Sequence, residues 1–120
     1  MQTLSIVEQF APDLEIIAVN DGSKDKTKQE IERAIRDDAK QPHPVVPGMR
    51  VSGTRIKLVT SNKNRGKGNA IISGISQAEG DYIAFVDADL ELNPAQLEGY
   101  LKKMQESGSD VVIGCKFHKD

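Results

Sequence analysis

The chain has little cysteine, few aromatic residues and almost no excess charge, and each shortage excludes a class of protein. Its 120 residues contain one cysteine, Cys115, which excludes an internal disulfide framework and a metal cage of several thiolates. Tryptophan is absent and aromatic residues make up 4%, too few for the stacking platforms that bind single-stranded nucleic acid. With 16 Lys and Arg against 18 Asp and Glu, the net charge is −2, which argues against any nucleic-acid partner held by bulk positive charge.

Long apolar runs are missing as well. No stretch approaches the roughly 20 apolar residues that cross a bilayer, and no signal-peptide pattern opens the sequence. A chain of this length can nevertheless bury about two-thirds of the surface that it exposes when unfolded. We therefore expect residues 1–120 to form one domain, or part of a larger one, of a cytoplasmic protein.

Four short apolar runs punctuate the sequence, and each has the length of a β-strand. Three of them are nearly continuous rather than alternating, which is typical of strands covered on both faces in a parallel sheet. The predicted strands are Glu15–Asn20, Arg55–Thr60, Tyr82–Asp87 and Asp110–Cys115.

Helical patterns lie between these runs. The first predicted helix covers Thr27–Asp38, the second begins near Gly68, and the third follows Asn93-Pro94 and ends at Ser107-Gly108. On the second helix we expect four residues to be buried: Ile71, Ile72, Ile75 and Ala78. Strands that alternate with helices in this way predict an α/β sandwich around a mainly parallel sheet.

Two stretches depart from this alternation. Residues 37–54 contain three prolines and no periodicity, which predicts a long loop. Residues Ser5–Phe10 place three apolar side chains on one helical face, so the chain opens in a helix with no strand before it. We therefore expect the usual first strand of such a sheet to be absent.

The triplet Asp87-Ala88-Asp89 ends the apolar run YIAFV and precedes a helix. Alternation along a strand would send both carboxylates to the same side, where they suit a hard divalent cation such as Mg²⁺ or Mn²⁺. The position agrees with this chemistry, since open α/β sheets bind ligands beyond the carboxyl ends of their strands. A solvated turn explains the same local pattern equally well, and Glu91 either extends the acidic group or belongs to that turn.

Two further turns follow predicted strands or open predicted helices. Asn20-Asp21-Gly22-Ser23 ends the first apolar run, and its carboxylate could accept hydrogen bonds from a nucleobase or a ribose. By itself, a capped turn explains this stretch better. The Asn64–Asn69 stretch combines two glycines with Arg65 and Lys67 at a helix N-terminus, an arrangement that favours phosphate. A plain polar turn remains the alternative.

Together these stretches resemble the family 2 glycosyltransferases of the GT-A fold, over about 90 of the 120 residues. The subgroup that it resembles moves mannose or glucose to a polyprenyl phosphate, and that subgroup's DADLQ is DADLE here. The stretches that carry the resemblance are EIIAVNDGSKDKT, NRGKGNAIISGISQAEGDYIAFVDADLELNP and DVVIGCKFHKD. In the last of these, Gly114-Cys115-Lys116 stands where the family usually has G-S-[KR].

The resemblance implies a Rossmann-like GT-A sandwich that binds a GDP- or UDP-sugar with Mg²⁺ or Mn²⁺. Asp87 and Asp89 would serve catalysis, and Asp87, Asp89 and Glu91 would hold the metal. The implied nucleotide-binding residues are Asn20, Asp21, Gly22, Ser23, Arg65, Gly66, Lys67, Asp87 and Ala88. Asp21 would contact the base or the ribose. A polyprenyl phosphate acceptor would place the protein at the cytoplasmic face of a membrane.

The sequence also departs from the family. Its members open with a strand whose P-x-[FY]-N-E-like segment contacts the base, and that segment is absent here, as is the region that normally holds the acceptor. We therefore expect a glycosyltransferase chain truncated at both ends, with unpaired strand edges that favour self-association.

Two other functions fit parts of the pattern. A domain that binds the nucleotide without catalysis would keep the same turns. A receiver-like signalling domain would use Asp21, Asp87 and Lys116, but its phospho-acceptor belongs on the third of five strands, and the Asn64–Asn69 stretch would have no role in it.

Overall fold

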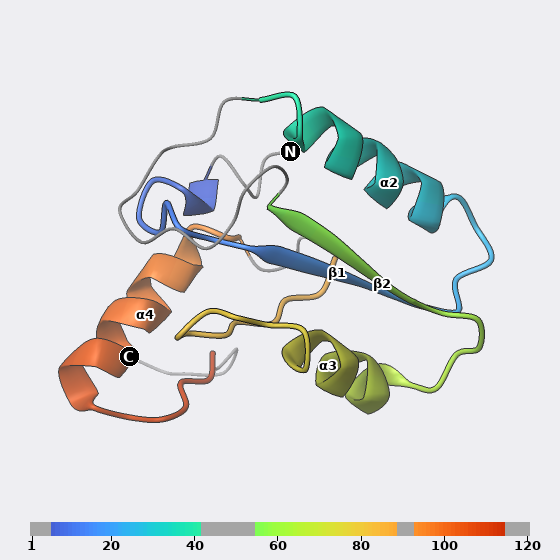
Figure 1. Ribbon diagram of the computed structural model, residues 1–120. Coiled ribbons are helices and arrows are strands. Elements are labelled where there is room, and N and C mark those ends of the chain that lie inside the picture. Colours follow the sequence, from blue (N-terminus) through green and yellow to red (C-terminus); the bar gives the residue numbers. More distant parts are fainter. Residues whose placement is uncertain (1–5, 42–54, 89–92, 115–120) are drawn as a thin grey trace.

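The computed structural model describes residues 6–41, 55–88 and 93–114. Within them, two strands form a parallel sheet in which Ile16 lies opposite Ile56 and Asp21 opposite Ser61. The elements are β1 (Ile16–Asp21), α2 (Thr27–Asp38), β2 (Ile56–Ser61), α3 (Lys67–Ile75) and α4 (Gln96–Ser107). Helices α2 and α3 lie on opposite sides of the strand pair (Figure 1). The predicted α/β class and the parallel sheet are confirmed.

The core lies where the amino ends of the strands meet α2. Leu14 and Ile56 are buried there, and partly buried apolar side chains pack around them: Val7, Ile16, Ala34 and Ile35. In the described part of the predicted opening helix, the Phe10 and Ala11 N–H groups donate to the Val7 carbonyl at 3.1 and 2.9 Å. Its apolar face therefore contributes to the core beside the strands.

A buried arginine joins three segments at this end of the sheet. Arg55, just before β2, is 6% exposed; its guanidinium donates to Asp38 Oδ1 at 3.1 Å and to Glu8 Oε2 at 2.7 Å. Its backbone N–H donates to Asp38 Oδ2 at 2.7 Å. Burial by itself would lower the pKa of Arg55, but the two carboxylates outweigh it and raise that pKa. Both strands begin and end one residue later than predicted. The Arg55 carbonyl still accepts from the Ile16 N–H at 2.7 Å, but the Arg55 N–H is bound to Asp38.

A second polar contact fixes the chain that leaves α3. Glu15 Oε1 accepts from the Glu79 N–H at 2.5 Å and from the Gly80 N–H at 3.2 Å, while Lys57 Nζ lies 3.0 Å from Glu15 Oε2. Burial by itself would raise the pKa of Glu15, but these hydrogen bonds outweigh that effect, so the pKa is lowered overall. The segment after α3 is thereby held at the start of β1.

Two of the four predicted strands are not formed. Residues 82–87 and the described part of Asp110–Cys115 have no strand structure, and most of their apolar side chains are exposed, with Phe85 at 66% and Ile113 at 83%. The prediction was wrong because a strand exists only where a neighbour completes its hydrogen bonds. Within the described residues, the sheet contains only β1 and β2.

The helices match the predictions more closely. Helix α2 has the predicted bounds, and residues 37 and 38 of the predicted loop are its last two; residues 42–54 lie outside the described residues. Of the four side chains predicted to be buried, Ile71 on α3 and Ala78, beyond the end of that helix, are half-buried. Ile72 and Ile75 on α3 are exposed, contrary to prediction, because no described element covers them.

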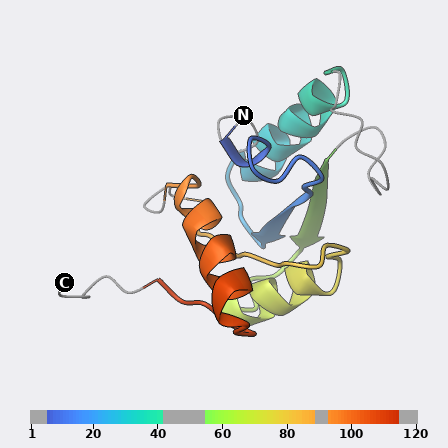
Figure 2. The ribbon, with the colours of Figure 1, turned by 90° about the vertical axis from the view of Figure 1, so that its left-hand side faces the viewer.

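Helix α4 lies to one side of the strand pair and away from α2 (Figure 2). It begins two residues after Pro94, although Asn93 Oδ1 accepts from the Ala95 N–H at 3.0 Å as the predicted cap requires. Gly108 ends it in the left-handed conformation, with φ of 66°, as predicted.

Candidate functional site

The carboxyl ends of β1 and β2 lie side by side, so the turns that follow the two strands meet at one edge of the sheet. The first turn contains Asp21, Gly22 and Ser23, and the second runs from Asn62 to Lys67, the first residue of α3. These turns contain two of the stretches that the sequence analysis identified as candidates. The two stretches lie more than forty residues apart in the sequence.

Asp21 binds the second turn directly. Its Oδ1 accepts from the Arg65 N–H at 3.0 Å, and its Oδ2 accepts from the N–H groups of Arg65 and Gly66 at 3.0 and 2.9 Å. Gly66 immediately precedes α3 and has a φ of 94°, a conformation that favours glycine. The carboxylate therefore fixes the backbone at the point where the turn becomes a helix.

Gly22 lets the two turns approach this closely. Its φ is 72°, and a Cβ there would lie 2.7 Å from the Lys63 carbonyl carbon and closer still to the Asn64 nitrogen. Since real Cβ atoms do not come so near to backbone atoms, any other residue would push the turns apart. The glycine is thus required by conformation and by space.

The neighbours of Gly22 shape the first turn. Asn20 is 5% exposed, and its Oδ1 accepts from the Ser23 N–H at 3.2 Å. Asp25 Oδ1 accepts from the Ser23 hydroxyl at 2.6 Å and from the Thr27 N–H at 2.9 Å, at the start of α2. These bonds, with that of the Thr27 hydroxyl, lower the pKa of Asp25 to about 2. The Asn20 and Ser23 side chains therefore make hydrogen bonds to residues of their own turn and the start of α2.

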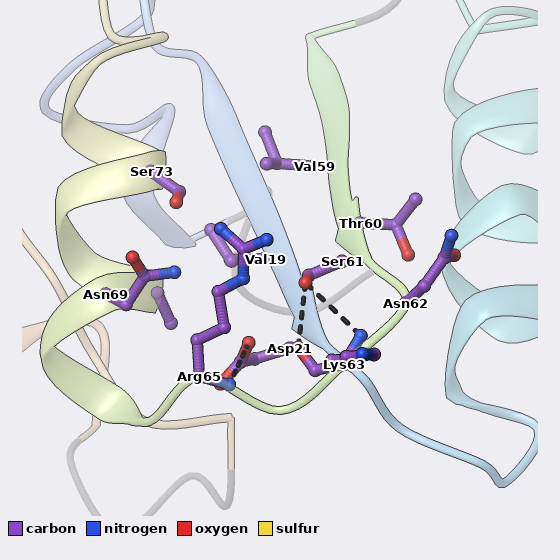
Figure 3. Close-up of a pocket in the computed structure, with 11 residues that line it drawn as sticks. Val19, Asp21, Val59, Thr60, Ser61, Asn62, Lys63, Arg65, Asn69 and Ser73 are labelled. Carbon is purple, nitrogen blue, oxygen red and sulfur yellow. Dashed lines mark hydrogen bonds between the residues drawn. The ribbon is translucent and has the colours of Figure 1, made fainter.

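A pocket of about 500 Å³ opens between the strand ends and α3 (Figure 3). Asp21 and Arg65 both line it, and the Arg65 side chain runs from the turn up between β1 and α3, toward Val19 and Asn69. The remaining lining residues come from β1, β2, the second turn and α3: Val19, Val59, Thr60, Ser61, Asn62, Lys63, Asn69, Ala70 and Ser73. The pocket thus has an apolar floor and polar or cationic walls.

Lys67 brings the acidic triplet to the same region. Its Nζ lies 3.1 Å from Asp87 Oδ1 and 3.2 Å from Asp87 Oδ2, and about two-thirds of each side chain is exposed. Asp87 and Ala88 follow the exposed apolar segment, outside the pocket lining. The pair therefore places one carboxylate of the triplet next to the glycine-containing turn.

A metal site can be tested only in part. Among residues 6–41, 55–88 and 93–114, no group of three or more His, Cys, Asp and Glu side chains is placed to hold a metal ion. Asp87 suits a hard cation as a single exposed oxygen donor, and its partner Lys67 is exposed enough to release it. The other two predicted ligands, Asp89 and Glu91, lie outside the described residues.

Most of the predicted nucleotide-binding residues lie close together at the two turns, but few of them line the pocket. Asn20, Asp21, Gly22, Ser23, Arg65, Gly66 and Lys67 meet at the two turns, but only Asp21 and Arg65 line the pocket. Sequence reasoning missed Ser61 and Lys63, which follow the second predicted strand and could have been found from its carboxyl end. It also missed Asn69 and Ser73, which lie four residues apart on one face of α3.

Comparison with known proteins identifies the family of the chain. The model of the family described as Glycosyl transferase family 2 matches residues 3–120. The chain belongs to the family 2 glycosyltransferases. This membership replaces the receiver-like alternative. No solved structure gives a significant match.

Relatives of this family 2 glycosyltransferase are considerably longer. The chain is 34% identical over 108 residues to a protein from Mycobacterium tuberculosis that is named as a putative glycosyltransferase. This match covers 90% of the chain and 27% of that protein. It is 34% and 35% identical over 111 residues to undecaprenyl-phosphate 4-deoxy-4-formamido-L-arabinose transferases of Enterobacter sp. and Photorhabdus laumondii. Those matches cover 92% of the chain and 29% and 30% of the relatives.

The chain therefore spans less than a third of the length of these curated relatives. In its described part, no helix combines the length and the apolar character that a membrane span requires.

Proposed function

We propose that this chain forms the nucleotide-binding part of a metal-dependent glycosyltransferase that takes a sugar from a nucleoside-diphosphate sugar. The observation that carries the proposal is the bond between Asp21 and the Arg65–Gly66 backbone, which joins two turns beside a pocket lined by both Asp21 and Arg65. Such a site at the carboxyl ends of parallel strands is where α/β sheets bind nucleotides.

The pocket suits the nucleotide part of the donor. Its volume of about 500 Å³ falls within the range of small-molecule sites, which is roughly 300–1,000 Å³. Val19 and Val59 offer an apolar surface to a base, and polar side chains such as Asn69 and Ser73 offer hydrogen bonds. The Arg65 guanidinium supplies positive charge for a phosphate, and its planar group can bind two phosphate oxygens at once.

The Lys67–Asp87 pair marks the expected position of the diphosphate and the sugar. Lys67 is a cation at the N-terminus of α3, where both its charge and the helix dipole favour phosphate. Asp87 and Ala88 would lie near the sugar or the ribose, and Asp87, Asp89 and Glu91 would supply carboxylates to Mg²⁺ or Mn²⁺. A bound cation would stabilise the charge that develops on the leaving nucleoside diphosphate.

The acceptor that we propose is a polyprenyl phosphate. Relatives that are 34% and 35% identical are named as transferases acting on undecaprenyl phosphate, and the sequence resembles enzymes with that class of acceptor. A phosphate acceptor is already ionised, so this reaction would need no carboxylate base to deprotonate a hydroxyl. The proposal places the reaction at the cytoplasmic face of a membrane.

Thermal melting with UDP and GDP, each with and without Mn²⁺, tests the proposal. A ligand that binds only the folded state raises the melting temperature, so we expect one nucleotide to stabilise the chain and Mn²⁺ to increase its effect. Asp89→Ala should abolish the Mn²⁺ increment, whereas Asp81→Ala, an exposed aspartate earlier on the same segment, should keep it.

Two results would contradict the proposal. One is that neither nucleotide stabilises the chain at millimolar concentration; the other is that Asp89→Ala responds to Mn²⁺ as the unchanged protein does. Transfer of radiolabelled sugar to a polyprenyl phosphate then separates a transferase from a domain that only binds the nucleotide.

A further inference from the structure

The Asp21 carboxylate is already occupied by the protein's own backbone. Both of its oxygens accept hydrogen bonds from the second turn, two from the Arg65 N–H and one from the Gly66 N–H, all at 2.9–3.0 Å. A carboxylate offers about four lone-pair directions, and the backbone of the second turn takes up a large share of them.

Few other hydrogen bonds among the described residues order the second turn. Residues 62–68 are exposed, and Gly66 and Gly68 give the backbone wide conformational freedom. Ser61 Oγ, at the end of β2, donates to the Lys63 carbonyl at 2.7 Å and holds the start of the turn, and Asn64 Oδ1 accepts from the Gly66 N–H at 2.9 Å within it. Asp21, the last residue of β1, therefore connects the Arg65–Gly66 part of this exposed turn to the sheet.

The side chain that gains from this connection is that of Arg65. With its N–H bound to Asp21, the Arg65 backbone is fixed at the rim of the pocket, and its guanidinium extends inward between β1 and α3 (Figure 3). A flexible turn would have to be ordered when a ligand binds, which weakens binding, whereas a turn that is held in advance avoids this cost.

We propose that Asp21 is a positioning residue that acts through Arg65: its carboxylate holds the second turn so that the guanidinium is already placed for the anionic part of a nucleotide. The inference rests on the proposed function and assigns Asp21 a role in addition to contact with the base or the ribose. Gly22 contributes to the same arrangement, because glycine has no Cβ and so lets the Lys63–Asn64 backbone come close to the first turn.

A double-mutant cycle tests whether Asp21 acts through Arg65. Asp21→Asn keeps the size of the side chain but replaces one acceptor oxygen with an NH₂ group that cannot accept. We expect it to weaken binding of UDP or GDP with Mn²⁺ by about tenfold or more. In the Arg65→Met background the same change should cost less than about twofold, because the positioned side chain is gone.

Equal losses in both backgrounds would overturn the inference, since they would mean that Asp21 contributes independently of Arg65. Asp25→Asn is the matched control. Asp25 also accepts backbone and hydroxyl hydrogen bonds at the first turn, but these come from Ser23 and Thr27 and not from the second turn. We expect this control to change nucleotide affinity by less than about twofold.

Hydrogen exchange of the backbone amides tests the positioning without any ligand. In Asp21→Asn, the Arg65 and Gly66 amides should exchange at least about tenfold faster, while amides of the β1–β2 ladder such as Val19 and Val59 stay protected. Gly22→Ala should have the same local effect although it leaves the carboxylate in place. Unchanged exchange at Arg65 and Gly66 in Asp21→Asn would overturn the inference.

The two measurements separate the two proposals. If neither nucleotide binds the unchanged protein, the proposed function fails, and the exchange of the Arg65 and Gly66 amides still decides whether Asp21 holds the turn. If a nucleotide binds but the cycle shows additive losses, the proposed function stands and the role of Asp21 is instead direct.

Discussion

Residues 14–76 and residues 78–114 carry similar sequence patterns, but only the first region forms a packed sheet. In the first, both predicted strands pair, two helices flank them, and the polar residues at the strand ends find partners. In the second, neither predicted strand is formed within the described residues. Large apolar side chains of its two apolar runs are exposed: Tyr82, Ile83, Phe85, Val86, Val111 and Ile113.

The difference teaches that an apolar run specifies a strand only together with a neighbour. β1 and β2 pair in register and satisfy each other's hydrogen bonds along one edge. Within the described residues, nothing pairs with the other edge of β1. The run Tyr82–Val86 therefore keeps its strand-like composition without a hydrogen-bonding partner.

The largest expected effect lies in the first region. Asp38→Ala should lower the free energy of unfolding by about 3–5 kcal/mol, because it removes one of the two carboxylates paired with the buried guanidinium of Arg55 and the acceptor of the Arg55 N–H. Asp37→Ala is the matched control on the same helical turn; its exposed pair with Arg33 should be worth less than about 1 kcal/mol. Urea unfolding measures both. A loss in Asp38→Ala as small as that in the control would contradict the packing described for the first region.

A smaller effect is expected in the second region. Phe85 is 66% exposed, so Phe85→Ser should change the free energy of unfolding by about 0.5 kcal/mol or less. The same variant should reduce self-association, which we predict from the exposed apolar segment, in sedimentation velocity at several protein concentrations. A loss of several kcal/mol on Phe85→Ser would show that this side chain is buried in solution, and the contrast between the two regions would then be wrong.

The smallest effect concerns Asp25 at the start of α2. Its pKa is lowered from 3.8 to about 2 in the folded state, so its ionised form stabilises the fold above pH 4, and this contribution is lost as the pH falls toward 2. We expect the melting temperature of the unchanged protein to fall more steeply between pH 4 and pH 2 than that of Asp25→Asn. Parallel curves for the two proteins would contradict the hydrogen bonding assigned to this carboxylate.

Much of the first region could be predicted from its residues alone. The bounds of α2 and the capping of α4 by Asn93 and Gly108 follow from local pattern, since helix hydrogen bonds join residues only four apart. The family resemblance also depended on local stretches, and the family match over residues 3–120 confirms it.

The contacts of the candidate site could not be predicted in this way. The sequence indicated Asp21 and Arg65 as separate candidates on separate turns, with nothing to show that one would bind the backbone of the other. The pocket residues on α3 were missed because helical periodicity assigns a face, but the sheet decides which face is covered. Ile72 and Ile75 show the same point in reverse: their pattern predicted burial, and no described element covers them.

By itself, the sequence determined the helices, the composition of the strands, the turns that need glycine, and membership of the family 2 glycosyltransferases. These depend on short-range sterics, hydrogen bonds within a few residues, and the order of motifs along the chain. Only the tertiary structure decided which strands pair, where the pocket opens and what the Asp21 carboxylate binds. Each of those depends on atoms from distant parts of the chain meeting at hydrogen-bonding distance, and no local pattern encodes that encounter.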